Sequence, residues 1–185
     1  MARRKDHTRE ELFQLAVKCG REIVIAEGPQ ALTARNVAKH MGYTAGTLYN
    51  VFDNIDGLTQ AINIDSLNRF TTELEDIIRA NSKTKKRLKL ICAAYQNFQA
   101  QQSALWTLLF AQQIEKKSET YQAAINSVFN QVAKVLLDIS SSPKVARQDA
   151  KVLWSTLHGI CLLKQSEKLN VGKNDSVEAL IERFL

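Results

Sequence analysis

Apolar residues recur every three to four positions along almost the whole chain, which is the spacing of amphipathic α-helices. The first apolar stripe follows a capping box made by Thr8 and Glu11 and stops at the pair Gly28-Pro29. A longer stripe starts after Asn54, whose side chain is suited to capping a helix. Further stripes cover Leu88 to Phe98, Leu105 to Phe110, residues 119–139, residues 143–168 and Val177 to Leu185. No segment reads convincingly as a strand, so the sequence predicts an all-α fold of about nine helices.

Two of the predicted helices, at residues 34–41 and 45–51, are much shorter than the others. Their apolar faces comprise Val37, Ala38 and Met41 in the first helix and Leu48, Val51 and Phe52 in the second. Gly42 lies between them and can adopt the positive φ that ends a helix, while Thr33 and Thr44 stand where the helices need N-caps. This pattern predicts a helix-turn-helix.

A helix as short as residues 45–51 matches the two or so turns that fit in the major groove of DNA. With Leu48 and Phe52 turned inward, a polar set faces outward, and its hydroxyl and carboxamide groups suit phosphates and base edges. That set comprises Thr44, Ala45, Thr47, Tyr49 and Asn50. The alternative is a short helical corner with a purely structural role.

Composition and charge narrow the class of protein. The chain of 185 residues carries a formal net charge of +6, which favours polyanionic partners, and residues 1–50 hold about half of this excess. Its three cysteines are far apart and lack the spacing of a zinc site or a disulfide framework, so we expect a reduced, cytoplasmic protein without cofactor. No apolar run reaches the length of a membrane span, and we expect no membrane partner.

Residues 27–58, EGPQALTARNVAKHMGYTAGTLYNVFDNIDGL, resemble the N-terminal signature of TetR-type transcriptional regulators. The resemblance implies a three-helix DNA-binding domain, a larger helical C-terminal domain, and a homodimer that leaves a near-palindromic operator when a small ligand binds. It also implies that Thr33 and Tyr49 hold phosphates and that Thr44 caps the second short helix and touches the DNA backbone. Ala45, Gly46, Thr47 and Asn50 are implied to face the groove.

The sequence departs from this signature at two positions. Ile55 stands where the family usually has a lysine that neutralises a phosphate, and Tyr43 replaces a small aliphatic residue. A missing phosphate contact lowers affinity and flattens its salt dependence. We expect the basic residues Arg3, Arg4 and Lys5 to compensate by reaching the DNA backbone or minor groove.

The predicted domain boundary lies after the second short helix, giving a DNA-binding domain at 1–53 and a ligand-sensing and dimerisation domain at 54–185. The helix from about 54 to 80 connects them. In the second domain, WSTLHG at 154–159 is similar to the Trp-x-x-x-His-Gly signature of one C-terminal subclass, in which Gly159 allows a helix to approach closely. Aromatic residues at helical spacing predict an apolar effector site, with plain core packing as the alternative. The candidate residues are Tyr95, Phe98, Trp106, Phe110, Trp154 and His158.

His158 and Cys161 alone are too few to predict a metal site. The last two helices, about 144–168 and 174–185, carry more apolar surface than one chain covers, so we expect a homodimer through them. The sequence thus predicts a homodimeric, sequence-specific repressor of double-stranded DNA released by an unknown small-molecule effector. The alternatives are a helical enzyme or protein-interaction module, and a DNA-binding protein that responds to a partner protein or activates. No catalytic grouping at a recognisable spacing supports an enzyme.

Overall fold

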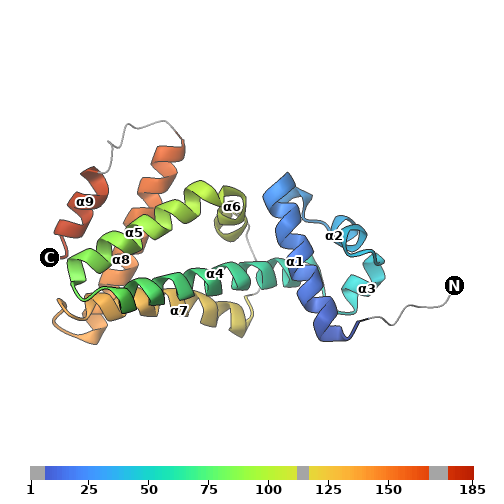
Figure 1. Ribbon diagram of the computed structural model, residues 1–185, viewed down its shortest axis with the longest axis horizontal. Helices are drawn as coiled ribbons and strands as arrows, with labels where there is room; N and C mark the ends of the chain where they lie inside the picture. Colours follow the sequence, from blue (N-terminus) through green and yellow to red (C-terminus); the bar gives the residue numbers. More distant parts are fainter. Residues whose placement is uncertain (1–6, 112–116, 167–174) are drawn as a thin grey trace. The chain divides into compact units, whose positions relative to one another are not determined.

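The computed structural model describes residues 7–111, 117–166 and 175–185. Within these ranges the chain forms nine α-helices and one 3-10 turn, and no strand (Figure 1). The expectation of an all-α fold is therefore confirmed. The α-helices are α1 (Arg9–Glu27), α2 (Ala34–Met41), α3 (Ala45–Tyr49), α4 (Ile55–Ala80), α5 (Thr84–Gln101), α6 (Ser103–Ala111), α7 (Glu119–Leu136), α8 (Pro143–Gln165) and α9 (Asp175–Glu182), and the 3-10 turn is η1 (Pro29–Ala31).

The first of two compact units holds α1 to α3, the first part of α4, and α6. It comprises the described residues among 1–66 and 102–122. In this unit α1 packs against α2, η1 and α6, and α2 packs against α3 (Figure 1). Arg21 on α1 donates hydrogen bonds to Ser66 Oγ at 3.0 Å and to Gln102 Oε1 at 2.9 Å, so it joins α1 to α4 and to the residue that precedes α6.

The second unit holds the remainder of α4 together with α5, α7 after its first turn, α8 and α9, from the described residues among 67–101 and 123–185. The short helix α9 packs against both α5 and α8. Two ion pairs join α9 to α5: Lys85 with Glu182 at 2.5 Å, and Lys89 with Glu178. The helix α9 is therefore held by side chains as well as by its apolar face.

The predicted helix starts agree with the structure. The side chains of Thr8 and Glu11 form the expected capping box. The helix expected from residue 143 starts at Pro143, and the structure adds a side-chain cap from Ser142. Asn54 Oδ1 accepts a hydrogen bond from the Gly57 backbone N–H at 2.9 Å, as expected of the residue before α4.

Four predicted helix ends are wrong by a few residues. The helices expected to reach about residues 168 and 185 end at Gln165 and Glu182. The helix expected at 45–51 ends at Tyr49, and the helix expected at 119–139 ends at Leu136. In the second case Asp138 faces α5, where it accepts a hydrogen bond from Thr84 and pairs with Arg87. The end of α7 is therefore set by a tertiary contact that its own apolar spacing does not contain.

Packing groups the helices differently from the predicted sequence boundary at residue 53, because α6 and the first part of α4 belong to the unit of α1 to α3. The division into 1–53 and 54–185 stays a prediction about domains. Among the helices described, none is both long and apolar enough to cross a membrane.

Candidate functional site

The two short helices and their turn are built by side-chain caps and one glycine. Thr33 Oγ1 accepts a hydrogen bond from the Asn36 N–H at 3.2 Å, and Thr44 Oγ1 accepts one from the Thr47 N–H at 3.3 Å. Gly42 ends α2 with φ of 74°, in the left-handed region that favours glycine. Both threonine caps and the positive φ were predicted from the sequence and are confirmed.

Apolar contacts and one arginine hold α3 in place. Leu48 is 2% exposed, and the ring of Phe52 stacks on Phe13 of α1 with centroids 5.0 Å apart. Arg9 on α1 donates hydrogen bonds of 3.4 Å to the carbonyl oxygens of Asn50 and Val51, just after α3. The short helix thus packs against α2, the residues just after it are held by α1, and its outer face is left to solvent.

The predicted DNA-facing residues lie on this outer face and in the two caps. Thr33, Thr44, Gly46, Tyr49 and Asn50 are exposed, with Tyr49 at 52%, whereas Ala45 and Thr47 are half-buried. Thr47 also exchanges a hydrogen bond with the Thr44 hydroxyl at 3.1 Å. The predicted arm residues Arg3, Arg4 and Lys5 lie outside the described residues.

The structure adds residues that sequence reasoning missed. The Tyr43 hydroxyl lies 2.6 Å from His7 Nδ1, so the residue that departs from the family pattern contacts the segment before α1. The cations Arg35 and Lys39 lie one turn apart on α2, and both are exposed. The contact between Tyr43 and His7 could not be predicted from local sequence, because 36 positions separate the two residues. The pair of cations could have been predicted, because their spacing of four residues places them on one face of a helix.

In the second unit an aromatic cluster brings together four of the six predicted effector residues. Tyr95 and Trp154 meet edge to face at 4.5 Å, and the Tyr95 hydroxyl lies 2.7 Å from His158 Nδ1. Phe70 of α4 contacts Tyr95, Phe98 and Trp154 at ring-centroid distances of 6.2, 5.8 and 6.0 Å. Burial lowers the pKa of His158, which favours the neutral imidazole that can accept the tyrosine hydrogen bond.

The other two predicted effector residues belong to the first unit. Trp106 and Phe110 lie on α6 with ring centroids 5.1 Å apart, and Trp106 is buried there. The candidate set therefore divides into a tyrosine-histidine cluster in one unit and an aromatic pair in the other. Phe70, which links the cluster, was missed because its position on α4 is read as an ordinary core position in the helical pattern.

Two family profiles match this chain. Residues 17–62 match the family described as bacterial regulatory proteins, tetR family, and residues 88–185 match the tetracyclin repressor-like C-terminal domain. The first match contains α2, the turn and α3, and the second contains the aromatic cluster except Phe70.

Individual proteins give similar results. The chain is 23% identical over 151 residues to an uncharacterised HTH-type transcriptional regulator of Mycobacterium tuberculosis, covering 82% of this chain and 69% of the relative. A protein of unknown function from Rhodococcus sp. RHA1 has the same fold, with a TM-score of 0.79 and 18% identity over 99% of this chain and 97% of the other. The regulator FadR from Bacillus subtilis, in complex with stearoyl-CoA, has a TM-score of 0.63 and 16% identity over 93% of this chain and 95% of its own.

Proposed function

The chain belongs to the TetR family of bacterial transcriptional regulators, and from this premise we propose that it is a homodimeric, sequence-specific repressor of double-stranded DNA. The observation that carries the proposal is the outer face of α3. Tyr49 on this face and the flanking Thr44 and Asn50 are exposed, while Leu48 is buried and Phe52, just after α3, stacks on Phe13 of α1. A helix held in this way presents side chains to a major groove without having to fold on binding.

The proposed roles of the DNA-facing residues follow from their positions. Tyr49 and Thr33 hold phosphates, and Thr44 touches the backbone beside its cap. Ala45, Gly46, Thr47 and Asn50 face base edges, with Asn50 suited to a bidentate contact with adenine. The exposed cations Arg35 and Lys39 add phosphate contacts, which offset the uncharged Ile55 at the start of α4. Arg3, Arg4 and Lys5 are proposed to add to these.

One face of α8 supports the proposed homodimer. Val152 is 54% exposed, and Leu162 and Leu163 are also exposed along the same stripe. Gly159 lies between them, and a Cβ atom added there would meet no atom within 4 Å. An apolar stripe with a small residue at its centre suits close packing against the same helix of a second copy. We propose that α8 and α9 form this interface, with two-fold symmetry that presents two α3 helices to two half-sites.

The aromatic cluster is the proposed core of the effector site. Tyr95 and His158 supply polar atoms within apolar surroundings, the usual composition of a small-molecule site. The similarity of WSTLHG to the Trp-x-x-x-His-Gly subclass supports this assignment. An effector releases the DNA only if it binds more tightly to the dimer geometry that does not match the operator.

Selection of bound sequences from a pool of random duplex DNA, at two salt concentrations, tests the proposal. We expect a near-palindromic sequence. Tyr49→Ala weakens binding about tenfold across all sequences, whereas Asn50→Ala relaxes the choice of base at one position of each half-site. Asn68→Ala, which removes an exposed amide from α4, is the matched control and leaves binding unchanged. Sequence-independent binding, or variants that change only the stability of the fold, would favour the alternative of a structural corner in an interaction module or enzyme.

With the operator known, small molecules can be screened for release of the DNA. An effector whose action is lost in His158→Gln, with operator affinity retained, would support the cluster as its site. An effector whose action survives both Tyr95→Phe and His158→Gln would place the site elsewhere.

A further inference from the structure

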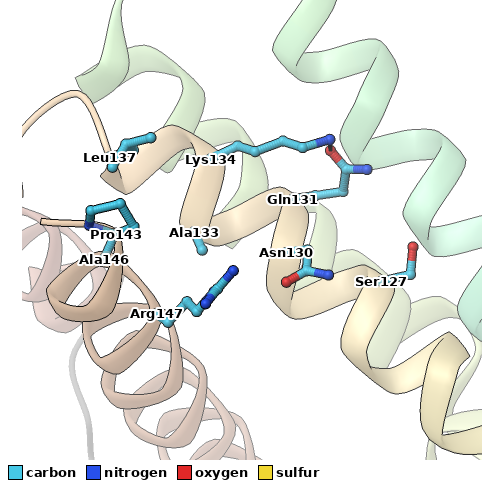
Figure 2. A pocket seen from close by; sticks show the side chains of 9 residues that line it. All are labelled: Ser127, Asn130, Gln131, Ala133, Lys134, Leu137, Pro143, Ala146 and Arg147. Atoms are coloured by element: carbon cyan, nitrogen blue, oxygen red, sulfur yellow. Dashed lines mark hydrogen bonds between the residues drawn. The ribbon is translucent and has the colours of Figure 1, made fainter.

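A cavity of about 350 Å³ lies between α7 and α8 in the second unit, outside the aromatic cluster (Figure 2). Its polar side is formed by side chains of α7 and one arginine of α8, and its apolar side by small and aliphatic residues near the start of α8. The lining residues are Ser127, Asn130, Gln131, Ala133, Lys134, Leu137, Pro143, Ala146 and Arg147. None of these nine carries a negative charge.

Two cations face this cavity from different helices. Figure 2 shows the Arg147 side chain reaching from α8 toward α7, with Asn130 and Lys134 on the α7 side. Within the described residues Arg147 makes no ion pair, and Lys134 makes one hydrogen bond, of 3.3 Å, to Gln131 Oε1. The Lys134 ammonium group keeps two further N–H donors, and the Arg147 guanidinium group has five. The charge of this pair is therefore not neutralised by a carboxylate on the same wall.

The polar wall is positioned by a buried residue. Gln131 is 6% exposed, and its Nε2 donates a hydrogen bond of 2.7 Å to Glu75 Oε1 on α4. That bond turns Gln131 Oε1 toward Lys134, whose ammonium group lies beside Gln131 and away from Arg147 (Figure 2). The first two turns of α8 also line the cavity, and the positive end of a helix dipole favours a nearby anion.

We propose that this cavity binds a small organic anion, whose carboxylate or phosphate group meets Arg147 and draws the Lys134 side chain from Gln131, and whose apolar part lies against Leu137, Pro143 and Ala146. The volume is in the range of small-molecule sites, and the apolar side offers more than a bare anion would use. Arg147 lies roughly 140° around α8 from Val152, at about 100° per residue, so the cavity is outside the stripe proposed for dimerisation. The inference does not depend on the proposed effector cluster, because the two share no residue.

An NMR titration of the full-length protein without DNA tests this inference, with phenyl phosphate and phenylacetate as the two anionic probes. Benzyl alcohol serves as the neutral probe, and inorganic phosphate as the probe without an apolar part. We expect saturable shifts confined to residues 127–147 for one or both organic anions, weaker by about tenfold in Lys134→Gln/Arg147→Gln. The anion preferred identifies which of the two headgroups the site takes.

The matched control is Lys86→Gln/Lys151→Gln, which removes the same charge from exposed positions on α5 and α8 outside the cavity. It should change the affinity less than twofold. Four results would overturn the inference: no saturable shifts at residues 127–147, equal weakening in both double variants, benzyl alcohol binding as tightly as the anions, or inorganic phosphate binding as tightly as phenyl phosphate.

Discussion

Replacing Gly42 by alanine tests whether the backbone of the turn between α2 and α3 limits the stability of the candidate DNA-reading motif. Gly42 has φ of 74° and ψ of 24°, and an added Cβ atom would meet nothing within 4 Å. A steric clash with neighbours is therefore absent, and the whole cost comes from placing an L-residue in the left-handed region. We expect Gly42→Ala to lower the free energy of unfolding by about 1 kcal/mol.

Asparagine gives this prediction its control, because it tolerates the left-handed region better than alanine does. Gly42→Asn should therefore recover about half of the loss. Gly28 has a similar φ of 88° but ψ of 168°, which lies outside the left-handed helical region and is accessible essentially only to glycine. Gly28→Ala and Gly28→Asn should cost the same, about 1–3 kcal/mol.

Urea unfolding followed by circular dichroism measures the free energy of unfolding of all four variants. The slope of this free energy against urea concentration should be the same in each variant, which checks that the folded and unfolded states stay comparable. For a chain of this length the loss at Gly42→Ala corresponds to about 2–4 °C in the melting temperature. An alanine variant at position 42 as stable as the natural protein, or an asparagine variant no better than alanine, would refute the reasoning.

Three further predictions concern side chains that are buried or half-buried. Phe52→Leu removes the ring stacked on Phe13, and the free energy of unfolding should fall by about 1–2 kcal/mol in urea titrations, while a loss below about 0.3 kcal/mol would contradict the role of the stacking. Burial lowers the pKa of His158, so the unfolded chain binds a proton more readily than the folded one, and the free energy of unfolding should fall as pH drops below about 6.5. His158→Gln should make the free energy of unfolding less dependent on pH in this range, and an unchanged pH dependence in this variant would contradict the prediction. Burial raises the pKa of the Cys92 thiol to about 12, so iodoacetamide at pH 8 should not modify Cys92 in the folded protein but should modify it in urea. Mass spectrometry measures the modification, and rapid labelling of Cys92 in the folded protein would contradict its burial.

Helix starts could be predicted from the sequence because their signals are local. A threonine cap and the residue it bonds to lie three positions apart, as at Thr8, Thr33 and Thr44, and each caps the helix it precedes. The end of α7 could not be predicted in the same way. It depends on Asp138 meeting Thr84 and Arg87, more than 50 positions away in the chain.

In the candidate sites, too, the features with local signals could be predicted and those that depend on tertiary packing could not. The turn and the outward set of α3 follow from a short apolar pattern and one glycine. The grouping of Tyr95 with Trp154 and His158 depends on how α5 packs against α8, and Phe70 joins them from α4, which periodicity alone does not fix. Spacing within one helix also cannot tell that Trp106 and Phe110 belong to a different unit.

The packing of α6 against α1 and η1, together with the bonds from Arg21 to Ser66 and Gln102, bears on how this regulator can be re-engineered. A chimera that joins residues 1–53 to the C-terminal part of another regulator would place a foreign sixth helix beneath α1 and would leave Arg21 without these two partners. Under the proposed function, exchange of DNA specificity should therefore be attempted at the outer face of α3. Exchange of ligand response would need a graft that carries α6 with the N-terminal helices.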